Sequence, residues 1–461
     1  MGRRGAVAAV ACALAAAGGP KAQEAAPPTG TVAEIVAATL AAEDAGTDPS
    51  AHGAPLGLSA LIGLAEASHP VLLRQRTDIA IAAEALAATG AEYRPGIVAR
   101  AAAVATERDA VLQDGGSFAR DDTQQSASVA LDQTLYDGGR RSLRRQAAAL
   151  RLRAAEARLR GVRRDIAIGV ASDYHGYLAA RSNVADNEAL VALLREDLRA
   201  ANARERAGDA SRTDIAATRS RLALARAGLA GARLALTASL ASLASATGRD
   251  AADLARGLDA QDADAAPCDL PPSDQVRTLA LSADPALLAA RLQTAVAKTE
   301  AAIAGRANAP TLALAARAST ARQVSPVIDE NDELSLGLSL TVPIYQGGRG
   351  ASARRTGALQ TQSAFLGERE ARRVAELRIA QRLAQLDAAR SAVAAQAARS
   401  EAAALAAEGI RVGQGVGFYD TIDTLNADAD TLAARIDAAD ARANLRTTIF
   451  AVCAEIGAAE R

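Results

Sequence analysis

The stretch "LYDGGRRS" at Leu135–Ser142 decides the fold, because it recurs as "IYQGGRGAS" at Ile344–Ser352. Each phrase follows a stretch in which apolar and polar residues alternate, and each precedes a long run rich in Ala, Arg and Leu. Alternation with period two is typical of a strand with one apolar face, and an Ala-rich run is typical of a helix. The phrase Tyr-x-Gly-Gly-Arg is therefore predicted to mark the passage from a strand into a helix, twice in one chain.

The two phrases belong to a tandem repeat. A shift of 209 residues superposes them and also places Gly208 on Gly417 and Asp214 on Asp423. Upstream, a shift of 215 places "SHPVLL" on "ADPALL". Glycine tolerates backbone angles that other residues avoid, so the glycines of the phrases allow a sharp change of direction. The corresponding residues of the two predicted junctions are Tyr136, Gly138 and Gly139 in the first copy and Tyr345, Gly347 and Gly348 in the second.

The repeat divides the chain into segments. The first repeat covers 56–248 and the second covers 271–457, and the linker between them, 249–270, is rich in Asp, Ala and Pro. Ahead of the repeats, Arg3 and Arg4 precede a short apolar run and small residues, which is typical of a secretory signal peptide. We assign 1–23 to that signal and 24–55 to an N-terminal periplasmic segment, and we find no later apolar run long enough for a transmembrane helix.

Each repeat is predicted to begin with a short helix and two strands. In the clearest strand, Leu334 to Tyr345, Leu, Val or Ile stands at every second position. Its counterpart, Ser128 to Tyr136, alternates less regularly, and weaker strands follow Pro95 and Pro310. The strand pairs are predicted at 95–137 and 310–345, with hydrophilic loops at 107–125 and 319–332.

The remainder of each repeat is predicted to be a long helical hairpin. From Arg140 to about Arg206 the chain reads as one helix of about 65 residues, roughly 100 Å long. Gly208 then breaks the helix and Ser211 can cap the next one. After the turn, apolar residues recur every seven positions, as in a coiled coil. These residues are Ile215, Leu222, Leu229, Leu236 and Leu243, and the hairpin tips are placed near 208–214 and 415–423.

Composition excludes several classes of function. Aromatic residues make up 2% of the chain, there is no Trp, and 52 basic residues balance 53 acidic ones, so the basic surface of a nucleic-acid binder is not expected. The histidines His52, His69 and His175 lack the spacing of metal ligands, and neither a nucleophile elbow nor a phosphate-binding loop is present. We therefore predict no catalysis, no metal and no cofactor.

Two cysteines follow the signal peptide, Cys268 and Cys453. An exported chain meets an oxidising compartment, so a disulfide between them is one interpretation. Two unrelated buried thiols are the other.

Four strands with one apolar and one polar face do not make a stable sheet alone. In a bilayer each unsatisfied backbone group at an open edge costs several kcal/mol, whereas a closed barrel has no edges. Four strands are too few to close around a polar lumen, so a homo-oligomer that pools its strands is expected. Arg100 and Arg317 fall on the polar faces of their strands and are assigned to the barrel lumen. The alternative is a soluble β-sandwich that caps a coiled coil.

These features together resemble the TolC-like outer membrane efflux protein family. The resemblance rests on the two Tyr-x-Gly-Gly-Arg junctions, on the tandem duplication, on the endings "LASATG" and "VCAEIG", and on the tip patterns that begin at Gly208 and Gly417. It implies a mainly helical fold with tandem helical hairpins that form an α-barrel. It also implies four transmembrane strands per chain and a homotrimer with a twelve-stranded barrel in the Gram-negative outer membrane. The linker would form part of an equatorial belt around a periplasmic tunnel.

The resemblance also implies partners and a role. Members are exit ducts that dock through their hairpin tips onto a periplasmic adaptor tied to an inner-membrane ABC or RND transporter. They pass secreted proteins or small toxic molecules to the exterior. A structural alternative remains, namely an exported coiled-coil stalk or adhesin without a channel.

At the tips, the resemblance assigns Asp214 and Asp423 to the pore aperture, together with Asn426, which stands where the family often has a second Asp. A ring of carboxylates favours cations. The simpler interpretation is that each Asp is a first-turn helix residue favoured by the helix dipole. Gly208, Ser211 and Gly417 are the candidate adaptor-docking residues.

Overall fold

The computed structural model describes residues 56–111, 117–207, 211–258, 268–325 and 328–458, without the side chains of 108–111, 117–122, 323–325, 328 and 329. The expected signal peptide, the segment 24–55 and Gly208 therefore lie outside the described residues. The described chain is mostly helical and contains one small antiparallel sheet. It divides into two units.

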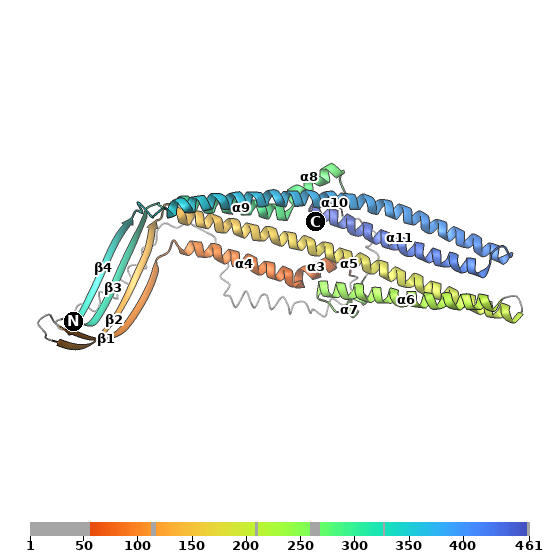
Figure 1. Cartoon of the computed structure of the whole chain (residues 1–461), viewed down its shortest axis with the longest axis horizontal. Coiled ribbons are helices and arrows are strands. Elements are labelled where there is room, and N and C mark those ends of the chain that lie inside the picture. The colour runs from red at the N-terminus through yellow and green to blue at the C-terminus, as the bar shows by residue number, and fades with distance from the viewer. Residues whose placement is uncertain (1–55, 112–116, 208–210, 259–267, 326–327, 459–461) are drawn as a thin grey trace. The chain divides into compact units, whose positions relative to one another are not determined.

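The first unit holds the sheet and the helix segments next to it, within 80–153 and 292–365. The strands lie side by side in chain order and all pairs are antiparallel (Figure 1). Both expected strand pairs are confirmed, and β2 pairs with β3 to join them. The strands are β1 (Gly96–Val111), β2 (Ser117–Tyr136), β3 (Thr311–Ser325) and β4 (Ile328–Thr341).

The strands differ from the expected ones at both ends. The hydrophilic loops expected at 107–125 and 319–332 are wrong, because the ladder continues through polar pairs such as Thr106 opposite Asp122. Polar side chains on a strand indicate exposure to water, and they do not interrupt backbone pairing. At the other end β4 stops at Thr341, although the strand was expected to reach Tyr345. Pro343 has no N–H to donate to a ladder, which accounts for the early end.

The helices follow the repeat. The shift of 215 moves both ends of α3 onto those of α8, and the shift of 209 moves the first residues of α5 and α6 onto those of α10 and α11. The first repeat contains α3 (Leu58–Ser68), α4 (Pro70–Ala91), α5 (Arg140–Ala207) and α6 (Arg212–Thr247), followed by α7 (Ala251–Gly257). The second contains α8 (Ser273–Ala283), α9 (Pro285–Gly305), α10 (Arg349–Gly415) and α11 (Thr421–Glu455).

The second unit is built on the two hairpins, α5–α6 and α10–α11, within 56–79, 154–291 and 366–458. The expected seven-residue seam of α6 is confirmed, since its Ile and Leu side chains are buried or pack against the buried clusters. The matching residues of α11, from Leu445 to Ile456, pack with Val276 of α8 and Leu386 of α10. Each hairpin thus carries a short helix, α3 or α8, docked on its flank.

The predicted linker at 249–270 contains α7, which Asp250 caps and whose Leu254 is buried against Leu61 and Leu243. Its residues 259–267 lie outside the described part of the chain. One expectation needs correction. No later segment was expected to be apolar enough to cross a membrane, yet α6 is long and apolar enough by length and composition. Its hairpin partner α5 carries charged residues along its whole length.

Candidate pore strands and hairpin tips

Strand register gives the sheet one apolar face. Across the four strands, Ile97, Leu131, Ala316 and Leu336 stand opposite one another in one row. The next row on the same face is Ala99, Val129, Ala318 and Leu334. These side chains are not covered within the chain, since Leu336 is 72% exposed. An uncovered apolar surface of this kind marks a contact with lipid or with another protein.

The opposite face is polar and carries both arginines. Arg100 stands opposite Ser128, in the row that ends at Glu333 on β4. Arg317 stands one row away on the same face, between Ala130 and Ser335. The expected placement of both arginines on the polar faces of their strands is confirmed, and neither lies among the leucines.

At the first strand-to-helix junction the backbone turns through the two glycines. Gly138 and Gly139 have φ of 69° and 76°, in the left-handed region that favours glycine. A Cβ at Gly138 would lie 2.3 Å from the Cβ of Ala309, so the position has no room for a side chain either. Gly138 is therefore required both for its backbone angle and because a side chain would not fit there.

Arg141, one helical turn further, fixes the same junction. Its guanidinium is buried and donates hydrogen bonds to the carbonyl oxygens of Glu92, Thr134 and Leu135 at 3.0, 2.8 and 3.1 Å. The backbone N–H of Arg141 donates to the carboxylate of Asp137 at 2.8 Å. The end of β2 is thereby tied to the start of α5. Sequence reasoning missed Arg141, because nothing in the local pattern separates it from the other arginines of the helix.

The second junction has the same turn and lacks the clamp. Gly347 and Gly348 have φ of 59° and 82°. The residue that corresponds to Arg141 under the shift of 209 is Gly350, which packs on Asn308. The residues before the turn are uncovered, with Ile344 90% and Tyr345 85% exposed. The two junctions are thus alike in backbone and different in side-chain support.

The hairpin tips place both aperture candidates in capping boxes. At the first tip, the Asp214 N–H donates to the Ser211 hydroxyl at 3.1 Å and the Ser211 N–H donates to the Asp214 carboxylate at 3.0 Å. At the second, Asp423 and Asp420 exchange the same bonds at 2.9 and 3.1 Å. Such reciprocal bonds satisfy free N–H groups at a helix start. Each aspartate therefore has a structural role, which leaves its second carboxylate oxygen available for another.

The second tip also exposes apolar side chains. Gly417 has φ of 87°, and the Phe418 N–H donates to the carbonyl of Gly413 at 2.9 Å. Gly413 lies under the Tyr419 ring, since a Cβ there would approach the ring to 2.5 Å. Phe418 is left 84% exposed. The sequence indicated the glycine of this turn but not the aromatic residue that the turn projects.

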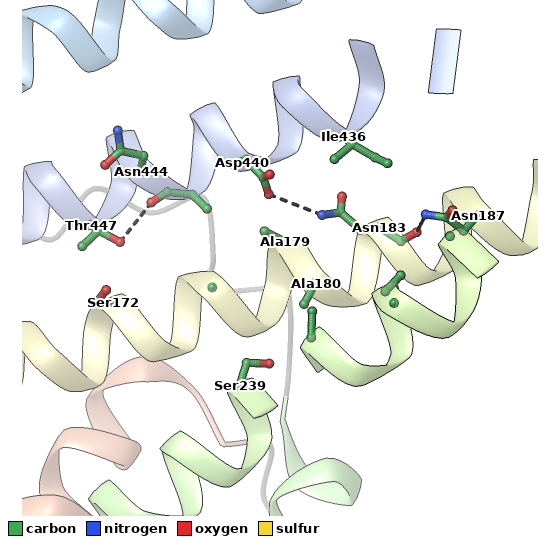
Figure 2. Close-up of a pocket in the computed structure, with 16 residues that line it drawn as sticks. Ser172, Ala179, Ala180, Asn183, Asn187, Ser239, Ile436, Asp440, Asn444 and Thr447 are labelled. Atoms are coloured by element: carbon green, nitrogen blue, oxygen red, sulfur yellow. Dashed lines mark hydrogen bonds between the residues drawn. The ribbon is translucent and has the colours of Figure 1, made fainter. Parts of the chain in front are cut away.

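The two hairpins meet through polar contacts. In the groove of about 750 Å³ in Figure 2, Asn183 of α5 donates to Asp440 of α11 at 3.4 Å. On either side of it, the Asp186–Arg435 pair and the His175–Thr447 hydrogen bond also join α5 to α11. The α6 wall of the groove offers only small residues, including Gly228 and Gly231. Nothing in the sequence alone paired these helices, because the partners lie far apart along the chain.

A buried ionic cluster lies around Arg164, nearer to the start of α5 than the groove. Arg164 bonds to Glu455 at 3.0 Å, and Arg378 bonds to the other oxygen of Glu455 at 2.9 Å. Asp284 pairs with both arginines. Four elements thus meet at this group of charges, namely α5, the start of α9, α10 and α11, and Arg164 also pairs with the exposed Asp165. Nearby, Cys268 and Cys453 form a disulfide that fastens the segment before α8 to α11.

Ionisation is perturbed where α5 approaches α11. Burial raises the pKa of Asp428, although its bond to Arg411 partly offsets this. Burial also raises the pKa of Asp197, with the Asp428 charge as the next cause. Among the described residues no three His, Cys, Asp or Glu side chains are arranged to hold a metal ion. Asp428 joins α11 to α10 through its ion pair with Arg411.

Comparison with protein-family models identifies one family. The family model described as outer membrane efflux protein matches residues 61–249 and 276–457, which is most of the chain. No curated protein matches the chain. A membrane protein from Pseudomonas aeruginosa has a similar structure, with 20% identity, coverage of 87% of this chain and 93% of that one, and a TM-score of 0.74.

Two further solved structures share the fold. VceC of Vibrio cholerae is 17% identical over 87% of this chain and 96% of its own, with a TM-score of 0.71. The CmeC outer membrane channel of Campylobacter jejuni is 15% identical over 87% and 86%, also with a TM-score of 0.71. Each of these structures covers 87% of this chain, so the shared fold extends over most of its length. The chain belongs to the outer membrane efflux protein family.

Proposed function

We propose that three copies of this chain form an exit duct in the Gram-negative outer membrane. The observation that carries the proposal is the sheet, which has one exposed apolar face, one polar face with two arginines, and β1 and β4 at its edges. Pairing β4 of each copy with β1 of the next closes a barrel of twelve strands without open edges. Arg100 and Arg317 then line the lumen, and Tyr136 and Tyr345 suit the bilayer interface.

The hairpins provide the periplasmic part of the duct. Asp214, Asp423 and Asn426 are proposed to lie at the aperture, and Ser211 and Gly417, with Gly208, to lie where a periplasmic adaptor docks. The exposed Phe418 adds an apolar contact to that docking surface. An inner-membrane ABC or RND transporter supplies the cargo, either a secreted protein or a small toxic molecule. The family is one of transport, and we propose no catalysis.

The sheet can be tested with one pair of adjacent substitutions. Leu336→Arg places a charge on the apolar face, at a cost of about 2–4 kcal/mol near the bilayer midplane. Ser335→Arg places the same charge on the polar face. In the outer membrane fraction, we expect wild type and Ser335→Arg to give a heat-modifiable trimer with discrete conductance steps in planar bilayers. Leu336→Arg should give little trimer. A soluble or monomeric wild type would support the stalk or adhesin.

The aperture can be tested without disturbing the caps. Asn keeps an oxygen that accepts the capping bond, so Asp214→Asn with Asp423→Asn removes charge and preserves the helix starts. We expect weaker cation selectivity of the open channel. Unchanged cation selectivity would mean that Asp214 and Asp423 cap their helices and do not act at the aperture. The cargo is identified by deletion in the host, where loss of a secreted protein indicates secretion and drug sensitivity indicates efflux.

A further inference from the structure

The outer side of α6 is an apolar surface that nothing in the described chain covers. Leu224 and Leu234 are 66% and 71% exposed. The apolar stretch that makes α6 long and apolar enough to cross a membrane is almost entirely exposed in the single chain. Insertion of α6 into lipid is disfavoured, because its hairpin partner α5 carries charged residues throughout. Another protein surface is therefore needed to cover it.

A second exposed stripe of α6, beside this apolar surface, alternates charged and small side chains. Arg219, Ala223, Arg226 and Ala230 are all exposed and are spaced four, three and four residues apart, so they form one line on the helix. Within the described residues, neither arginine has an ion pair with a carboxylate. On this stripe, two positive charges are thus separated by the small side chain of Ala223.

A complementary stripe lies on α10. Glu401, Leu405, Glu408 and Val412 are also exposed and have the same spacing. Leu405 and Val412 are 75% and 62% exposed, so both large apolar side chains are free to contact another surface. Glu408 pairs only with Arg411 on its own helix among the described residues. This stripe has negative charges where the first has positive ones, and large apolar side chains where the first has alanine.

The two stripes lie at similar distances from the tips. Arg219 is seven residues from the start of α6 and Glu408 is seven residues from the end of α10, which is about 10 Å in each case. A hydrogen bond between Arg221 of α6 and Asn426 of α11 shows that the two tips are level to within about 6 Å. Two copies related by an axis along the hairpins would therefore bring the stripes to the same height.

We propose that α6 of one copy packs antiparallel against α10 of the next copy. Arg219 and Arg226 then face Glu408 and Glu401, and Leu405 fills the gap beside Ala223. This contact rests on the proposed trimer and names the surfaces that would hold its hairpins together. Small residues allow close approach of the two helices, and the alternating charges fix their direction and register.

Charge reversal tests the contact on the full-length trimer in detergent. We expect Glu401→Arg with Glu408→Arg to lose the heat-resistant trimer band at a temperature where wild type retains it, and Arg219→Glu with Arg226→Glu to do the same. The combination of all four substitutions should restore the band, because the pairs are re-formed with opposite signs. A control reversal, Glu370→Arg with Glu376→Arg, changes exposed residues of the same helix that pair only locally, and should leave the band unchanged.

Cross-linking provides a second measurement. The two cysteines of the described residues are bonded to each other, so introduced thiols react with a bismaleimide on their own. Ala223→Cys with Leu405→Cys should give covalent dimers and trimers, and Ala223→Cys with Leu377→Cys should not. A wild type that is not trimeric would overturn the proposed duct. A trimeric wild type with no cross-link and no effect of charge reversal would overturn this contact alone.

Discussion

The guanidinium carbon of Arg141 lies 4.4 Å from the centre of the Tyr93 ring. With its hydrogen bonds to three carbonyl groups and its pairing with Asp137, this places one buried cation at the meeting point of α4, β2 and α5. Because a barrel built from several chains depends on the angle at which each strand pair leaves its helices, Arg141 is expected to hold that angle in the first repeat.

Replacing Arg141 by Ala should lower stability by about 3 kcal/mol, because three carbonyl groups lose their buried donor and Asp137 keeps only Arg144 as a charged partner. The temperature at which the trimer dissociates on a denaturing gel measures the effect. Arg153→Ala, an exposed arginine on the same helix, is the control and should change little. Equal stability of both variants would show that the junction does not depend on the clamp. Arg141→Lys should recover only part of the loss, since an ammonium group lacks the planar fork.

Much of this fold could be predicted from the sequence, because the repeat is written in local patterns. The period of two in Leu334–Thr341, the seven-residue spacing from Ile215 to Leu243, and the paired glycines at 138–139 and 347–348 each follow from nearby residues. The wrong prediction of loops was also made from nearby residues. Polar composition at 107–125 was interpreted as a loop, although pairing in an antiparallel ladder uses the backbone alone.

The contacts that set the candidate sites could not be predicted in this way. Arg164 and Glu455 are 291 residues apart, and His175 and Thr447 are 272 apart. No pattern within one helix indicates which distant helix will lie beside it. For Asp214, the serine three residues earlier indicates the cap that the structure has, whereas its place at the aperture stays a prediction from the resemblance.

The disulfide gives a second prediction. Cys268 and Cys453 close a long loop, with a sequence separation of 185, so removing the bond should cost roughly 2–5 kcal/mol. Cys268→Ala with Cys453→Ala should unfold at lower denaturant concentration than wild type, as followed by circular dichroism. Wild type unfolded in reductant should match the double variant. Free thiols in wild type unfolded without reductant would contradict the assignment.

The ionic cluster around Glu455 gives a third prediction. Glu455 is almost fully buried and accepts bonds from both Arg164 and Arg378. Glu455→Gln removes the carboxylate that bonds both arginines and leaves Arg378 with Asp284, and Arg164 with Asp284 and the exposed Asp165, so we expect a loss of about 3 kcal/mol. Glu370→Gln is the matched control, since its bond to Arg373 is exposed to solvent and should have no measurable effect. A loss of similar size in both variants would indicate that burial of the cluster is unimportant.

The pH dependence of the contact between the hairpins gives the last prediction. His175 is 5% exposed, and burial, followed by the charge of Arg446, lowers its pKa from 6.5 to about 4. Thr447 donates its own hydroxyl proton to the Ala443 carbonyl, so neutral His175 donates through Nδ1 to the Thr447 oxygen at 3.1 Å. The folded state thus prefers the neutral ring. Stability from this preference is complete above pH 6.5 and is lost as the pH falls toward 4.

His175→Gln cannot titrate and still has a donor for Thr447. Unfolding of wild type and variant is therefore compared between pH 4 and pH 8, and the difference removes the titration of the carboxylates that both proteins share. We expect wild type to lose up to about 3 kcal/mol relative to the variant as the pH falls from 6.5 to 4. A difference that stays constant over this range would mean that the His175 ring takes up its proton as readily in the folded chain as in the unfolded one.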